Sequence, residues 1–253
     1  MPSRREHRVV ADLDFIVPDW PVPAGVRAAV SLRTGGVSAG RYASLNLGDH
    51  VGDDPGHVRT NRDRLRAALG LPAEPLWLEQ VHGTDVARFT GEQRPRADAA
   101  VALAPGQVCA VMVADCLPVL LADRDGTCVA AAHAGWRGLA AGVIERTVAA
   151  LPVKPSRLVA WLGPAIGPEA FEVGPEVRQA FLADEPETAG DFRPGAGDRW
   201  LADIYALARR RLARLGIRDV SGGGLCTVSE PDRFFSYRRD GGTGRFAALV
   251  WRE

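Results

Sequence analysis

Residues 108–138 read VCAVMVADCLPVLLADRDGTCVAAAHAGWRG, and this stretch decides the fold. Three uninterrupted apolar runs occupy 108–114, 119–122 and 127–132. Runs without polar alternation are typical of strands that are buried on both faces. The Asp-Arg-Asp-Gly sequence at 123–126 predicts a hairpin turn between the second and third runs. The stretch therefore predicts the centre of a buried sheet.

Strand and helix patterns continue on both sides of this centre. Further strands are expected at 26–34, 75–81, 157–162, 234–238 and 245–251, and helices at 55–70, 139–151, 175–182 and 203–215. The polar, glycine-containing segments 37–54 and 183–200 predict surface loops. Because no linker interrupts the patterning, we expect one mixed α/β catalytic domain over 1–253.

Composition places the chain among ordinary globular proteins. It has 253 residues, of which 46% are hydrophobic and 25% are charged. The net charge of zero argues against nucleic acid as a partner, because wide binding of nucleic acid needs a surplus of Lys and Arg. No apolar run approaches the roughly 20 residues of a membrane span, and the first residues do not resemble a signal peptide. We expect a soluble cytoplasmic protein with no membrane contact and no obligate protein partner.

Three metal-binding residue types end or follow the apolar segments. His133 ends the third run just before Gly135 and a helix start, where α/β proteins place their chemistry. Cys116 follows the first run, and His82 follows the strand expected at 75–81. The separations of 34 and 17 positions (116 − 82 and 133 − 116) differ from the close ligand pairs of zinc fingers. Three such ligands from separate segments, with a fourth position open, are typical of catalytic zinc.

The chemistry expected of such a site is that of a Lewis acid. Catalytic zinc lowers the pKa of water to about 7 and polarises substrates. Asp115, beside Cys116, is a candidate partner for an imidazole N–H group. The residues alone leave other roles open, because Cys116 could be a thiolate nucleophile activated by His133. A core role for Cys116 and a turn role for His82 are also compatible with the pattern.

Several basic residues are candidates for holding an anion. Arg137 lies in a Gly-Trp-Arg-Gly turn that opens a helix, where free N–H groups and a guanidinium can act together. Arg245 and the pair at 238–239 offer similar groups near the C-terminus. His50, in a polar loop, could line a pocket. A solvated surface position is the alternative for each of them.

Short motifs run in order from about residue 30 to the C-terminus. They are RTGGVS at 33–38, SLNLGDHVGD at 44–53, NR at 61–62, QVHG at 80–83, ADA at 97–99, ADCLP at 114–118, HAGWRG at 133–138, GPAIG at 163–167, FEVG at 171–174, SYRRD at 236–240 and TGR at 243–245. Together they resemble the YfiH/laccase-domain family, formerly called multicopper polyphenol oxidoreductases. So many ordered matches are far more specific than any one motif.

The resemblance implies a fold, a metal and a reaction. The fold would be mixed β-sheets covered by helices, in α-β-β-α layers. The metal, usually Zn²⁺, would be bound by residues matching His82, Cys116 and His133. The reactions would be phosphorolysis of adenosine, inosine, guanosine or methylthioadenosine, and deamination of adenosine, with purine nucleosides and phosphate as ligands. The older label requires several coppers, and five histidines, with His7 and His57 looking peripheral, are too few for that.

Site roles follow from the motifs as expectations. The residues expected to be catalytic are Cys116, His133, Asp115 and Arg137, and those expected to bind substrate are His50, Arg62, Glu172 and Arg245. Arginines 137, 62 and 245 are candidates for orienting phosphate, and Asp115 or Glu172 for assisting proton transfer. The competing hypotheses are a Cys-His hydrolase acting in peptidoglycan editing and a copper-dependent polyphenol oxidase.

Overall fold

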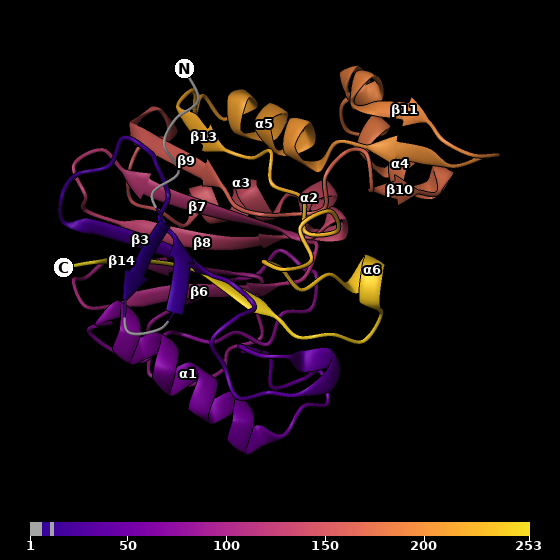
Figure 1. Ribbon diagram of the computed structural model, residues 1–253. Coiled ribbons are helices and arrows are strands. Elements are labelled where there is room, and N and C mark those ends of the chain that lie inside the picture. Colours follow the sequence, from indigo (N-terminus) through magenta and orange to yellow (C-terminus); the bar gives the residue numbers. More distant parts are fainter. Residues whose placement is uncertain (1–6, 11–12) are drawn as a thin grey trace.

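The computed structural model describes residues 7–10 and 13–253, with side chains from residue 13 onward. Residues 1–6 and the side chain of His7 lie outside the described part of the chain. The structure therefore does not test the expectations about a signal peptide and about a peripheral His7. Two sheets face each other in the middle of the molecule, and helices cover both outer faces (Figure 1). The expected α-β-β-α layering of a mixed α/β fold is confirmed.

The first sheet is antiparallel throughout. Its order is β1 (His7–Val10), β2 (Leu13–Ile16), β3 (Val26–Ser31), β14 (Phe246–Arg252) and β6 (Val108–Val113). Helix α1 (Pro55–Leu69) lies on its outer face (Figure 1). Asp54 caps the helix by accepting hydrogen bonds from Gly56 N and His57 N, and Gly70 ends it in the left-handed region.

The second sheet is mixed. Its order is β13 (Val220–Gly222), β9 (Leu158–Leu162), β7 (Leu117–Asp123), β8 (Val129–Ala134), β5 (Ala99–Ala102) and β4 (Val86–Arg88). The outermost pairs at both edges are parallel, and the inner pairs are antiparallel. Helices α2 (Trp136–Ala141), α3 (Val143–Ala149) and α5 (Ile204–Arg214) cover its outer face (Figure 1). The turn predicted at 123–126 joins β7 to β8, as expected.

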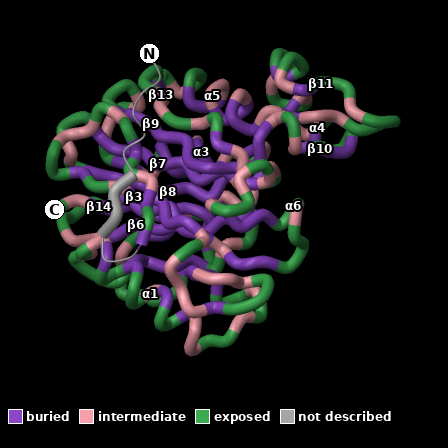
Figure 2. Tube along the Cα trace, in the orientation of Figure 1, coloured by how far each residue is buried: buried purple, intermediate pink, exposed green. Residues whose placement is uncertain are grey.

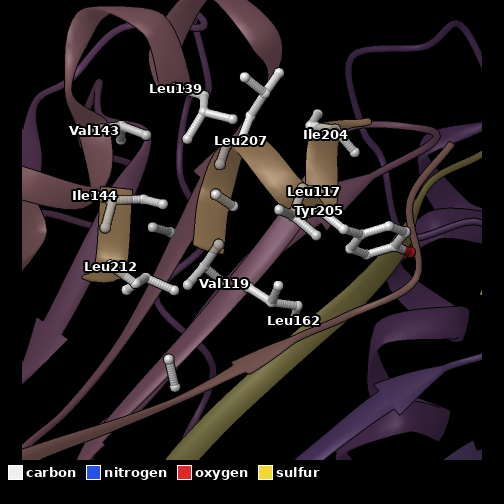
Figure 3. Close-up of a cluster of buried hydrophobic side chains, with 14 of the residues drawn as sticks. Leu117, Val119, Leu139, Val143, Ile144, Leu162, Ile204, Tyr205, Leu207 and Leu212 are labelled. Carbon is white, nitrogen blue, oxygen red and sulfur yellow. The ribbon is translucent and has the colours of Figure 1, made fainter. Parts of the chain in front are cut away.

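Alternate residues of β7 face opposite layers of the core. Val119 faces Leu207 and Leu212 of the covering helix α5 (Figure 3). Leu121 belongs to the same cluster. Leu120 belongs to the cluster between the two sheets. Because both faces are covered, the strand is buried at every position, and the two central layers are the most buried part of the molecule (Figure 2).

The chain changes sheets between the first two apolar runs. Strand β6 ends at Val113 in the first sheet, and β7 begins at Leu117 in the second. The connecting tripeptide 114–116 therefore crosses from one sheet to the other at one end of the sandwich. It carries two of the predicted site residues, Asp115 and Cys116.

Three predicted elements are wrong in detail. The segment 75–81 is not a strand, because isolated bridges at Leu76 and Glu79 connect it to different parts of the molecule. The helix expected at 139–151 is the pair α2 and α3, broken at Gly142 with φ of 94°. The strand expected at 234–238 is also wrong, because the Ser236 side chain caps a short helix, α6 (Tyr237–Asp240).

A projecting unit replaces the surface loop that was expected at 183–200. It consists of a three-stranded sheet, β10 (Glu172–Val173), β12 (Trp200–Ala202) and β11 (Phe192–Pro194), with helix α4 (Pro175–Leu182) and the 3₁₀ helix η3 (Pro186–Asp191). The unit stands off one end of the sandwich (Figure 1). Two further 3₁₀ turns are η1 (Gly40–Tyr42) and η2 (Pro155–Arg157). Within residues 7–10 and 13–253, no helix is both long and apolar enough to cross a bilayer.

Candidate metal centre and its cavity

The three predicted ligands meet in space. One donor atom from each of His82, Cys116 and His133 lies within 4.8 Å of the others. Cys116 Sγ is 3.7 Å from His82 Nε2, and the two imidazole rings have centroids 4.8 Å apart. His133 lies near the end of β8, Cys116 directly precedes β7, and His82 lies in the loop before β4. The hairpin register pairs Pro118 with His133 and so brings Cys116 close to His133.

Two residues of the site have an unusual backbone conformation. Within the described residues, His82 and Asp115 are the non-glycine residues with positive φ, at 60° and 93°. This region costs an ordinary residue roughly 1–2 kcal/mol, so surrounding contacts must hold it.

Two glycines of the HAGWRG motif are required by close packing. A Cβ on Gly135 would lie 2.8 Å from His82 Cδ2 and 3.0 Å from Cys116 Sγ. A Cβ on Gly138 would lie 2.8 Å from the carbonyl oxygen of Gly83. The turn after His133 must therefore be glycine-rich for the three ligands to approach one another.

Asp98 is the acidic partner of the ligands, and the sequence-based roles missed it. Its side chain is fully buried. Oδ1 accepts from His133 Nδ1 at 2.8 Å and from His82 N at 2.9 Å, and Oδ2 accepts from the backbone N–H groups of Val81 (3.2 Å) and Gly83 (2.6 Å). The bond at Nδ1 leaves His133 Nε2 free to ligate a metal. A signal was present, since Asp98 is the one charged residue within 97–102.

Asp115 does not have the imidazole partner role that was expected of it. Its Oδ1 accepts from Thr227 Oγ1 at 2.5 Å, and its Oδ2 accepts from the backbone N–H of Arg238 at 2.6 Å. Its own carbonyl accepts from Ile166 N at 2.9 Å. Asp115 thus fastens three separate segments around the site, and Asp98 occupies the position beside the imidazole.

The thiol and the buried imidazole form a charged pair in the absence of metal. Burial alone would raise the pKa of Cys116, but the charge of His133 and hydrogen bonds from both imidazoles lower it to about 6. Burial would lower the pKa of His133, but the charges and hydrogen bonds of Cys116 and Asp98 raise it to about 9. Burial also opposes ionisation of Asp98, yet its pKa is lowered, chiefly through His133 and the backbone N–H groups. The site is therefore prepared for a cation.

The donor set fits a zinc ion. Tetrahedral zinc with bonds of about 2.3 Å to sulfur and 2.0–2.1 Å to nitrogen separates S and N ligands by about 3.6 Å. The observed separation between Cys116 and His82 is 3.7 Å. Two imidazoles and one thiolate also match the three-ligand pattern of catalytic zinc, which leaves a fourth position for solvent or substrate.

A cavity of about 360 Å³ opens directly onto the three ligands. Its volume lies within the range of about 300–1,000 Å³ of small-molecule sites. Three aromatic side chains line it, Trp136, Phe171 and Tyr237, and the last is 61% exposed. Arg238 and Arg245 supply positive charge to the wall. The cavity therefore combines a metal-binding wall, flat apolar surfaces and cations.

The other predicted site residues divide into two groups. His50, Asp115 and Arg245 line the cavity. Arg62 does not belong to the described lining, because its guanidinium donates twice to the carbonyl of Leu47 (3.0 and 2.8 Å) and stacks on the Trp77 ring.

Two more predicted residues lie outside the described lining, although a neighbour of each belongs to it. Arg137 is exposed and lies over the Trp136 ring, with its guanidinium carbon 4.4 Å from the ring centroid. Glu172 is exposed on β10, next to the lining residue Phe171. Neither side chain is placed to act at the metal centre in this arrangement.

Comparison with known proteins gives consistent matches. A family model described as multi-copper polyphenol oxidoreductase laccase matches residues 27–253. Purine nucleoside phosphorylase YfiH of Shigella flexneri is 58% identical over 239 residues, covering 94% of this chain and 98% of that protein. Purine nucleoside phosphorylase PA4543 of Pseudomonas aeruginosa is 56% identical, covering 94% and 98%. The crystal structure of Neisseria meningitidis protein NMB0706 has a TM-score of 0.91 at 52% identity, covering 94% and 99%.

Proposed function

The chain belongs to the multi-copper polyphenol oxidoreductase laccase family, and we propose that it is a zinc-dependent purine nucleoside phosphorylase with residues 1–253 as one catalytic domain. The observation that carries the proposal is the cavity, in which three metal ligands share a wall with aromatic side chains and arginines. The names of the relatives that are 58% and 56% identical support the reaction class.

We assign His82, Cys116 and His133 to the metal. Zinc bound there would act as a Lewis acid at the cavity wall and would lower the pKa of water to about 7. The protein's part is to hold the ligands: Asp98 fixes the His133 ring, and Gly135 leaves room for the other two. The ring N–H group of His133 is thereby kept away from the cation.

The aromatic side chains suit a purine nucleoside. A purine is flat and polarisable, so it gains from stacking against Trp136, Phe171 or Tyr237. His50 adds a polar group to the same wall. Adenosine, inosine, guanosine and methylthioadenosine share a purine joined through N9 to C1′ of a ribose ring, and we propose them as the substrate set.

The phosphorolysis step can be written with all bonds accounted for. A phosphate oxygen forms a bond to C1′ of the ribose as the bond from C1′ to purine N9 breaks, and the electron pair leaves with N9. The purine takes the proton that dihydrogen phosphate gives up, so the products are a free purine and ribose 1-phosphate. The cations Arg238 and Arg245 would orient the anion for this attack. Asp115 serves as a wall residue here, because both its carboxylate oxygens already accept hydrogen bonds.

We include adenosine deamination as a second reaction of the same cavity. Adenosine and water give inosine and ammonia, and this reaction needs the purine but no phosphate. The metal centre beside the aromatic wall supports it.

Substitution of Cys116 tests the proposal. The Cys116→Ala protein should retain its fold, lose stoichiometric zinc, and lose at least about 100-fold in phosphorolysis rate, since it lacks one of three ligands. Cys128→Ala is the matched control, because Cys128 is buried in the core away from the cavity. A folded Cys116→Ala protein with full phosphorolysis and deamination rates would refute the site assignment.

A thiol hydrolase is the second candidate function. The observation that favours it is the Cys116 thiol, whose pKa of about 6 beside His133 is that of an activated nucleophile. Such an enzyme, for example one that edits peptidoglycan precursors, would work without metal and would be inactivated by alkylation of Cys116. Retention of activity after chelation would therefore favour the hydrolase over the phosphorylase.

The family description also names a multi-copper oxidase. Within the described residues, one group of three or more possible ligands is found, at His82, Cys116 and His133. Such a group provides for one ion, whereas a multi-copper oxidase requires several coppers. Metal analysis after growth with both metals distinguishes one zinc from several coppers per chain.

A further inference from the structure

Arg245 is built into the cavity wall with its guanidinium fixed in one place. Its Nη1 donates to the carbonyls of Thr243 (2.9 Å) and Gly244 (3.0 Å). Its backbone N–H donates to Asn46 Oδ1 at 2.8 Å, and its carbonyl accepts from Leu47 N at 3.0 Å. These bonds fix both the guanidinium group and the backbone of Arg245. Little side-chain entropy therefore remains to be lost when a ligand binds.

Gly48 completes this arrangement. A Cβ at position 48 would lie 2.8 Å from Cγ of Arg245 and 3.2 Å from its Cβ. The aliphatic stem of the arginine therefore lies directly against the glycine backbone. Because the contact is made at the base of the side chain, any added atom at position 48 would move the whole guanidinium.

The charge of Arg245 has no ion-pair partner among the side chains of residues 13–253. The negative groups whose charges act on it most are Cys116 and Asp115. Both carboxylate oxygens of Asp115 already accept from Thr227 and Arg238, and Cys116 is assigned to the metal. A half-buried cation without a counter-ion is costly, and an anionic ligand would relieve that cost.

Arg245 lines the cavity, and two of its donor atoms have no hydrogen-bond partner within the described part of the chain. Within the described part of the chain, Nε and Nη2 have no hydrogen-bond acceptor, and neither is sealed from solvent. These two atoms form one edge of the guanidinium fork, which matches two oxygens of a tetrahedral oxyanion. The contrast with Arg62 is direct, because Nε and Nη2 of that residue both donate to Leu47.

We infer that Arg245 anchors the binding site for inorganic phosphate, with Gly48 setting its position and Arg238 as the second cation. The inference rests on the proposed phosphorylase function and selects among the arginines of the chain. Arg62 is committed to the scaffold, and Arg137 lies outside the described lining. The ligand class is a tetrahedral oxyanion, which could be free phosphate or the phosphoryl group of a nucleotide.

Four variants of the zinc-loaded full-length protein test the inference. Arg245→Met removes the fork, and Arg245→Lys keeps charge without bidentate geometry. Gly48→Ala keeps the arginine at position 245 but displaces its side chain. Arg252→Met is the matched control, because Arg252 stands at the other end of β14 and its Nη1 likewise donates to two carbonyls, those of Leu103 and Thr127.

The readouts are binding of inorganic phosphate by calorimetry and KM for phosphate at saturating inosine. We expect KM for phosphate to rise about 10- to 100-fold in Arg245→Met, because this variant loses a charge-assisted pair of hydrogen bonds. The rise should be smaller in Arg245→Lys and severalfold in Gly48→Ala. Zinc content and KM for inosine should stay within about twofold. Arg252→Met should match the wild type in both parameters.

The outcomes separate the inference from the function on which it rests. If the wild type binds phosphate and Arg245→Met binds it equally well, the assignment of Arg245 is wrong while the phosphorylase remains. If the wild type neither binds phosphate nor phosphorolyses inosine, the proposed function fails first. If adenosine 5′-monophosphate binds through Arg245 and inorganic phosphate does not, the site belongs to a nucleotide and the inference is overturned.

Discussion

Substituting Asp98 with asparagine isolates the part that this residue plays in holding the metal ligands. The carboxylate accepts four hydrogen bonds, two on each oxygen. An asparagine side chain keeps one acceptor oxygen and replaces the other with an NH₂ donor. If the NH₂ takes the Oδ2 position, the N–H groups of Val81 and Gly83 lose their acceptor. If it takes the Oδ1 position, His82 N and His133 Nδ1 lose theirs. The first orientation frees the backbone on both sides of His82, and the second removes one bond from each of the two histidine ligands.

The magnitude follows from the number of bonds lost. A buried donor left without an acceptor costs about 1–3 kcal/mol, and three of these four bonds are only partly buried, so the free energy of unfolding of the metal-free protein should fall by no more than about 6 kcal/mol. Loss of a carboxylate partner of a metal-bound histidine lowers metal affinity by about 10- to 100-fold, equivalent to about 1.4–2.8 kcal/mol. We therefore expect the Kd for zinc of Asp98→Asn to rise by one to two orders of magnitude.

Competition with a chromophoric chelator measures that Kd, and the absorption spectrum of the cobalt-substituted protein reports the ligand geometry. Asp123→Asn is the matched control, because Asp123 is buried at the end of β7 and its Oδ2 accepts from Thr127 N and Oγ1. The control should lose stability but keep its zinc affinity and its cobalt spectrum. A folded Asp98→Asn protein with a zinc Kd within about twofold of the wild type would refute the reasoning.

The remaining predictions concern the glycine turn, the thiol and the first helix. Gly135→Ala should raise the Kd for zinc at least about tenfold, because its Cβ would lie within 3.0 Å of two ligands, whereas Gly190→Ala, with nothing within 4 Å, should leave it unchanged. In metal-free protein the pKa of Cys116 is lowered to about 6, so the thiolate forms above that pH. The rate of alkylation by iodoacetamide should therefore rise around pH 6, whereas an ordinary thiol reacts near its pKa of about 8.5. Bound zinc should suppress this alkylation. Asp54→Ala should lower the free energy of unfolding in urea by about 1 kcal/mol through loss of the α1 cap, with zinc content unaffected; an unchanged midpoint would show that the cap contributes nothing.

Local signals in the chain were enough to predict the centre of the fold. The three apolar runs are β6, β7 and β8, the turn at 123–126 joins the last two, and the cap at Asp54 begins α1. Each of these depends on neighbouring residues. The assignment of β6 to a separate sheet could not be predicted this way, because it is paired with β14, more than 130 positions away (from Val108 to Trp251).

The site was predictable by residue type but not by contact. His82, Cys116 and His133 follow or end extended segments, and that placement alone singled them out. The imidazole partner was assigned to Asp115 because it neighbours Cys116, yet the partner is Asp98, which the pairing of β5 with β8 brings beside His133. Sheet pairing of distant segments determines this contact, and no local pattern encodes it. The roles expected of Arg62 and Arg137 likewise rested on residue type and neighbouring residues, which do not show whether a side chain reaches the cavity.

Product analysis of adenosine incubated with the zinc-loaded protein, with and without phosphate, tests the central claim most directly. Zinc-dependent phosphorolysis predicts adenine and ribose 1-phosphate in equal amounts only when phosphate is present, with loss of both after chelation and recovery after zinc is restored. Inosine formed without phosphate would add the deaminase reaction. Unchanged adenosine under all conditions, or adenine formed equally without phosphate or without zinc, would contradict the claim.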